Sequence, residues 1–180
     1  MLRATLRPIA RRLLPVAAVM AMLPAGLAPA QAIERNARQA RPYYVEFRAR
    51  PSNDIGHSVI MYGRLGADGR PAERRFASFV PHVSGRKGMI FPVYASVYAS
   101  AADIHTPPST SYRRALTAAE YARMRRAVQR LTVREHLWHA FLFNCNQLPS
   151  EVADAIGLHR PPSIFPPNLW VDTLRALNER

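Results

Sequence analysis

The chain has 180 residues, with 25 lysines and arginines against 12 aspartates and glutamates, and its formal net charge at pH 7 is +13. This length suits one domain with a real core and not comfortably two. The positive charge favours anionic partners, but nucleic acid is not the expected one, because no zinc-finger, RNA-binding sheet or helix-turn-helix pattern is visible.

Residues 1–32 have the pattern of a secretory signal peptide. A stretch with four arginines and no acidic residue precedes an almost wholly apolar run, and small residues suit cleavage after Ala30 or Ala32. The alternative is an uncleaved membrane anchor, but Pro15 and Pro24 interrupt the run, which is short for a spanning helix. The sequence therefore predicts export to the periplasm or the extracellular space.

Cleavage would remove four of the 25 basic residues and no acidic one, which leaves a net charge of +9. An exported protein with this charge is expected to meet an anionic component of the cell envelope, such as a peptidoglycan peptide or a lipid. Peripheral contact with a membrane is part of the same expectation. Export also separates the chain from most nucleic acid.

The first half of the domain is predicted to be a small antiparallel sheet. Residues 33–42 are polar and basic and form a predicted mobile leader, after which residues 43–51 alternate as a strand does. Residues 57–65 and 75–83 form a predicted hairpin around the turn signal GADGR. Residues 84–112, rich in glycine, proline and small side chains, are predicted to be loop.

A helix is predicted after this loop, because Thr117 and Glu120 have the spacing of a capping box. Apolar residues then recur at helical spacing, namely Tyr121, Met124, Val128 and Leu131. Arginines occupy the opposite face, namely Arg123, Arg126, Arg130 and Arg134. This basic face is either simply solvated or a surface that docks on anionic lipid or polymer.

The C-terminal part is predicted to contain a strand and two helices. Residues 136–143 are almost continuously apolar, as in a strand buried on both faces. Residues 146–157 form a predicted helix, and a last helix begins at Asn168. Residues 43–180 are therefore predicted to form a single α+β domain, a small antiparallel sheet packed against helices.

Cys145 is the only cysteine, so it cannot form an internal disulfide. It lies where the predicted strand meets the predicted helix. With Asn146 as the N-cap, Pro149 falls in the first turn, and Cys145 lies one residue outside the helix. There the helix N–H groups would lower the pKa of its thiol and could receive an oxyanion. Its neighbours Asn144 and Asn146 are candidate binding residues.

A nucleophilic thiol needs a base, and His57 is the candidate because it opens a strand directly after a glycine. Folding of the hairpin brings residues 77–82 opposite His57, so His82 is the candidate that orients its ring, with Ser78 as the alternative. Asn53 and Asp54 in the preceding turn are further alternatives. No cofactor or metal is expected, because histidines three apart on a strand, as in HLWH, face opposite sides.

Two short motifs resemble those of a known superfamily. Gly56 and His57 open a strand, and Asn144 and Cys145 enter a helix later in the chain. This order resembles the circularly permuted branch of the papain-like superfamily, which includes NlpC-type cell-wall peptidases and lecithin retinol acyltransferase-like proteins. In that branch the histidine precedes the cysteine. The similarity spans about residues 43–158.

The resemblance implies a circularly permuted papain-like architecture, with Cys145 as the nucleophile, His57 as the base and a third polar residue near Ser78 or His82. It also implies hydrolysis of peptide amides in peptidoglycan, or acyl transfer or hydrolysis at lipids. The first hypothesis is therefore an exported cysteine-dependent hydrolase or acyltransferase that acts on an amide or ester of the cell envelope. The alternative is a non-catalytic envelope binding protein on a papain-like scaffold, with Cys145 buried.

Overall fold

An antiparallel sheet of six strands, in the order β5-β1-β2-β3-β4-β6, forms the centre of the α+β fold. The computed structural model describes residue 36 and residues 40–52, 55–83, 87 and 90–179. The strands are β1 (Tyr43–Arg50), β2 (His57–Arg64), β3 (Arg75–Pro81), β4 (Val93–Tyr98), β5 (Thr110–Leu116) and β6 (His136–Trp138). The helices within the described residues are α3 (Ala101–His105), α4 (Ala118–Thr132), α5 (Gln147–Ala155) and α6 (Pro167–Asn178).

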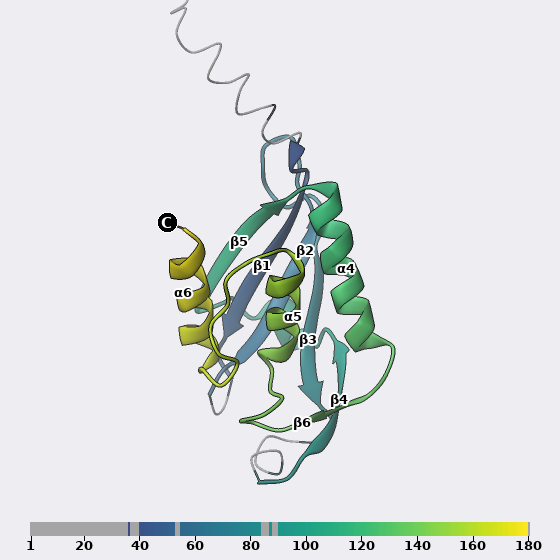
Figure 1. Ribbon diagram of the computed structural model, residues 1–180, viewed down its shortest axis with the longest axis vertical. Coiled ribbons are helices and arrows are strands. Elements are labelled where there is room, and N and C mark those ends of the chain that lie inside the picture. The colour runs from purple at the N-terminus through teal and green to yellow at the C-terminus, as the bar shows by residue number, and fades with distance from the viewer. Residues whose placement is uncertain (1–35, 37–39, 53–54, 84–86, 88–89, 180) are drawn as a thin grey trace, which may run out of the picture.

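Three helices cover one face of the sheet, which we call the helix face; Figure 1 shows α4, α5 and α6 in front of the strands. Alternate residues of the strands point to this face, among them Phe47 of β1 and Ile60 of β2, both fully buried. The ring of Trp170 in α6 lies 6.0 Å from that of Phe47. The main core therefore lies between the sheet and these helices.

The opposite face of the sheet, which we call the second face, carries buried polar groups. Glu46 is buried there and forms ion pairs with Arg48 and Arg113. The antiparallel register places Arg50 opposite His57, on the same face as Glu46. The short helix α3 contacts β3, and its Asp103 bonds Ser78 on this face.

The predicted hairpin and the predicted first long helix are confirmed. Strands β2 and β3 pair in antiparallel register, with Val59 opposite Ser78. Thr117 is the N-cap of α4, and a reciprocal capping box joins it to Glu120. Met124 and Val128 are buried on the predicted apolar stripe. Strand β1 also forms where the alternating pattern indicated.

The prediction that residues 84–112 are loop is wrong, because this span contains β4, α3 and the first part of β5. Its prolines precede the strands and do not interrupt them: Pro92 comes just before β4, and Pro108 comes shortly before β5. Strand β4 contains valines and tyrosines, which favour strands, besides the small residues Ala95 and Ser96, and it pairs with β3. The loop prediction gave weight to the glycines and prolines around β4 and not to the strand-forming residues within it.

The prediction of a long buried strand over residues 136–143 is also wrong. Strand β6 has three residues and pairs only with β4, at the edge of the sheet. The chain then turns between His139 and Phe143, whose backbones exchange hydrogen bonds of 3.0 and 3.1 Å. Phe141, Leu142 and Phe143 are therefore exposed and not buried.

The predicted signal peptide, its cleavage positions and most of the predicted leader lie outside the described residues. Among the helices that the structure does describe, none is long and apolar enough to cross a membrane.

Candidate functional site

The start of α5 holds Cys145 in the predicted position. Asn146 is the N-cap and α5 begins at Gln147, so Cys145 lies one residue outside the helix. The helical hydrogen bonds begin with Ser150, whose amide donates to the Asn146 carbonyl at 2.9 Å. The missing amide of Pro149 therefore removes no helical bond, as the sequence indicated.

The two asparagines beside Cys145 are tied to the protein and not held free for a ligand. Asn144 donates to the carbonyl of Ser163 at 2.9 Å, and Asn146 donates to the carbonyls of Ser163 and Phe165 at 2.9 and 2.7 Å. The Asn146 side-chain oxygen accepts a hydrogen bond from the hydroxyl of Ser58. Asn144 and Asn146 thus fasten the segment before α6, and strand β2, to the start of α5.

The thiol of Cys145 is buried. Its exposed fraction is 4%, and burial raises its pKa above the ordinary value. Hydrogen bonding from Ser58 and the charge of Arg50 act in the opposite direction but do not offset the burial. Loss of water around the sulfur is therefore the dominant influence on the pKa of this thiol.

His57 lies in a separate polar cluster. Its Nε2 atom is buried and lies 3.9 Å from the nearer carboxylate oxygen of Asp103. Burial lowers the pKa of His57 to about 4, although Asp103 raises it, and the charge of Arg50 lowers it further. The ring is therefore neutral at pH 7.

Asp103 is the centre of this cluster. Its carboxylate accepts hydrogen bonds from Arg50 at 2.7 Å, from the Ser78 hydroxyl at 2.7 Å and from the Ser100 amide at 2.9 Å. Burial alone would raise its pKa, but the hydrogen bonds from Ser78, Ser100 and Arg50 outweigh burial and leave the pKa lowered. Asp103 therefore stays ionised inside the protein and is paired there.

His57 and Cys145 lie on opposite faces of the sheet, because successive side chains of β2 point to opposite faces and Ser58, not His57, points toward Cys145. Ser58 points to the helix face, where it bonds Asn146 beside Cys145, so His57 points to the second face, toward Asp103. Within the described residues no hydrogen bond joins the Cys145 thiol to His57. The structure thus brings Cys145 together with Ser58, and His57 together with Asp103.

Gly56 explains the start of β2. Its φ of 86° lies in the left-handed region that favours glycine, and a Cβ atom there would come within 3.3 Å of the Arg50 carbonyl. The glycine lets the chain turn sharply into the strand. The Gly-His motif therefore has a backbone role besides any role of its imidazole.

The structure also locates the residues predicted to orient His57. The Nε2 of His82 lies 2.8 Å from the Ser96 hydroxyl and its Nδ1 lies 3.6 Å from Glu135, so its contacts are not with His57. Ser78 belongs to the cluster, through Asp103. The alternatives Asn53 and Asp54 lie outside the described residues.

Asp103, which sequence reasoning missed, is the carboxylate that faces His57. One signal was present: Ser100 and Asp103 have the spacing of a capping box, and both of its hydrogen bonds form at the start of α3. A helix of five residues is too short to show apolar periodicity, so the capping box was the one sequence signal for α3.

Two arginines on the basic face of α4 contact residues of α5. The Nε of Arg123 donates to the carbonyl of Ala155 at 2.9 Å, and Arg130 lies 3.9 Å from Glu151. Arg126 and Arg134 are exposed. Two of the four predicted docking arginines thus help to pack α4 against α5.

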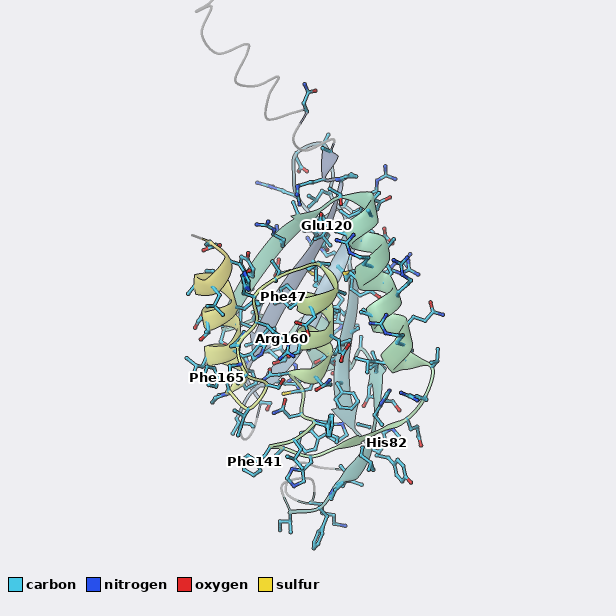
Figure 2. All side chains as sticks on the ribbon, in the orientation of Figure 1. Phe47, His82, Glu120, Phe141, Arg160 and Phe165 are labelled. Atoms are coloured by element: carbon cyan, nitrogen blue, oxygen red, sulfur yellow. The ribbon has the colours of Figure 1, made fainter. Side chains whose placement is uncertain are left out.

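A pocket of about 150 Å³ opens beside Cys145. Its lining is mostly apolar, with Cys145 and its two neighbouring asparagines at the base of α5. The apolar lining residues are Ile55, Ala140, Phe141, Ile164, Phe165, Pro166 and Pro167. Figure 2 labels Phe141 and Phe165 on the side where α6 begins and β6 ends. A cavity of this size can hold an apolar group comparable to benzene.

Comparisons of the chain with protein-family models, curated proteins and solved structures found no match. Among the described residues, no group of three or more histidine, cysteine, aspartate or glutamate side chains could hold a metal ion.

Proposed function

We propose that this chain is a non-catalytic binding protein whose pocket beside Cys145 holds an apolar group of its ligand. The burial of the Cys145 thiol carries the proposal. The thiol has a raised pKa and faces the hydroxyl of Ser58, a group that cannot act as a general base at neutral pH. Cys145 is then a small apolar part of the pocket wall.

The polar groups of the site agree with binding by shape and apolar contact. The amides of Asn144 and Asn146 are already bonded to Ser163 and Phe165, so they position the pocket wall. The ligand would gain its free energy of binding by burying apolar surface against Ile164 and Phe141.

The proposal also includes a papain-like scaffold and a location outside the cytoplasm. The order of a Gly-His strand and a later Asn-Cys helix in an antiparallel α+β fold supports a circularly permuted papain-like architecture. The N-terminal pattern supports export to the periplasm or the extracellular space, and the net charge of +9 that remains after cleavage supports an anionic envelope component as the partner.

Filling the pocket tests this proposal. Ala140 is buried and lines the pocket, so Ala140→Leu should occupy the space that a ligand group needs. Titration with benzyl alcohol, followed by the amide resonances of Cys145 and Asn146, should shift those resonances in the wild type and not in Ala140→Leu. Ala176→Leu on the exposed side of α6 is the matched control and should behave as the wild type does. Equal shifts in all three proteins would refute binding in this pocket.

A thiol hydrolase or acyltransferase is the second candidate, because Cys145 lines a pocket and lies one residue before the N-terminal turn of α5. In that function the Cys145 sulfur attacks an amide or ester carbonyl, the amine or alcohol leaves with a proton, and water or a second substrate releases the acyl group. His57, paired with Asp103, would have to take the thiol proton from the other face of β2. Equal loss of turnover in folded Cys145→Ala and His57→Ala would favour this candidate over the first.

A further inference from the structure

One end of the molecule exposes an unusual set of large apolar side chains, which we call the apolar end: Phe91, Tyr94, Leu137, Phe141, Leu142 and Phe143. They come from the segment before β4, from β4, from β6 and from the turn after β6. Tyr94 lies directly opposite Leu137 in the β4-β6 pair, so these segments are neighbours. They lie at the lower end of Figure 1, and Figure 2 labels Phe141 there.

The side chains of the apolar end are held outward by the backbone. The turn after β6 is fixed by the two hydrogen bonds between His139 and Phe143, which leaves Leu142 with an exposed fraction of 66%. Phe91 is 67% exposed. Monomeric proteins rarely expose large apolar patches unless a partner covers them, and exposed apolar side chains from several segments gather at this end.

Charge selects among the partners that could cover the apolar end. Lys87 lies in the segment between β3 and β4, and Arg134 lies in the segment between α4 and β6. Both side chains are exposed, and so is that of Glu135, which follows Arg134. A second copy of this basic chain would bring like charges together. An anionic bilayer offers acyl chains to the apolar residues and phosphates to the cations, and aromatic side chains favour the interface between them.

We propose that the apolar end inserts into the interface of a bilayer that contains anionic phospholipid. Phe91 and Leu142 enter the acyl region, while Lys87 and Arg134 remain at the headgroups. The lipid contact is thus assigned to the apolar end and not to the arginine face of α4. This inference does not rest on ligand binding in the pocket beside Cys145, and either can fail without the other.

Site-specific fluorescence quenching tests the insertion. The full chain with Leu142→Trp is mixed with phosphatidylglycerol-phosphatidylcholine vesicles whose acyl chains carry bromine. The signal of Trp138 and Trp170, measured in the wild type, is subtracted. The added tryptophan should lose most of its emission, because bromine quenches only at close range. Leu169→Trp, at a half-exposed position of α6, is the matched control and should keep its emission.

Each other outcome overturns the proposal. Equal quenching of both variants would mean adsorption without orientation, and quenching of neither would mean that the apolar end stays outside the bilayer. Unchanged quenching with phosphatidylcholine alone would remove the role of the anionic headgroup. A dimer in sedimentation velocity without vesicles, dissociated by Leu142→Arg, would assign the apolar end to a second copy.

Discussion

At the scale of single residues, the chain keeps one carboxylate, Asp103, ionised inside the protein. Its partners come from three separate segments: Arg50 ends β1, Ser78 lies in β3 and Ser100 caps α3. A buried charge with three donors is a strong constraint, because loss of one charged partner leaves the other charge without compensation. Asp103 therefore joins these three segments.

Asp103→Asn should lower the free energy of unfolding by about 3 kcal/mol, because the mostly buried side chain of Arg50 would lose its carboxylate partner. Urea denaturation followed by circular dichroism measures this change. Asp172→Asn, which removes an exposed carboxylate paired with Arg175, is the control and should cost less than about 1 kcal/mol. Similar losses in the two variants would contradict the buried network.

His57 makes the stability depend on pH. The unfolded chain binds a proton at His57 near the ordinary pKa of 6.5, but the folded chain binds it only near pH 4. The stability linked to this ring is therefore complete above pH 6.5 and is lost as the pH falls toward 4. Between pH 7 and pH 5, the free energy of unfolding of the wild type should fall by about 2 kcal/mol more than that of His57→Gln. Parallel losses in wild type and variant would show that the His57 ring is not buried.

At the scale of elements, the register of β2 decides what the site can do. The Gly-His motif correctly places His57 at the start of this strand. Side chains alternate along a strand, so a shift of one residue in the pairing register would exchange which of His57 and Ser58 faces α5. Pairing with β1 and β3 sets that register, and a local motif does not contain it. The start of α5 was predictable because Pro149 constrains it locally.

Other elements show the same division between local and non-local information. The helix α4 was predictable, since its cap and apolar stripe lie within one segment. Strand β4 was not predicted, because glycines and prolines flank its valines and tyrosines, and its pairing with β3 and β6 is not visible in the local sequence. The exposure of Leu142 was also unpredictable, because an apolar run does not reveal that β6 lies at the edge of the sheet.

The cap of α4 should contribute measurable stability. Thr117 accepts a hydrogen bond from the Glu120 amide, so Thr117→Ala should cost about 1 kcal/mol in the free energy of unfolding. Thr132→Ala is the control, because its hydroxyl only bonds the Val128 carbonyl within the helix, and it should cost little. Thermal denaturation of both variants gives the comparison. A smaller effect for Thr117→Ala than for Thr132→Ala would exclude the cap as a source of stability.

At the scale of the whole molecule, the apolar pocket and the charged cluster around Asp103 lie in different parts of the fold. The pocket beside Cys145 lies where the segments before α5 and α6 meet, and the Asp103 cluster lies on the second face. Phe141 belongs both to the pocket wall and to the apolar end, so a bilayer at the apolar end would lie close to the pocket. Ligand binding in the pocket and membrane contact at the apolar end, as proposed, would therefore share the side chain of Phe141.

Alkylation of Cys145 tests the central claim, a buried thiol in a binding pocket, most directly. Cys145 is the only cysteine, so mass spectrometry after treatment with iodoacetamide reports on it alone. Near neutral pH the folded chain should remain unmodified, and full alkylation should appear only when denaturant unfolds it. Rapid alkylation of the folded chain, with a rate midpoint below the free-cysteine pKa of about 8.5, would contradict the account and restore Cys145 as a nucleophile.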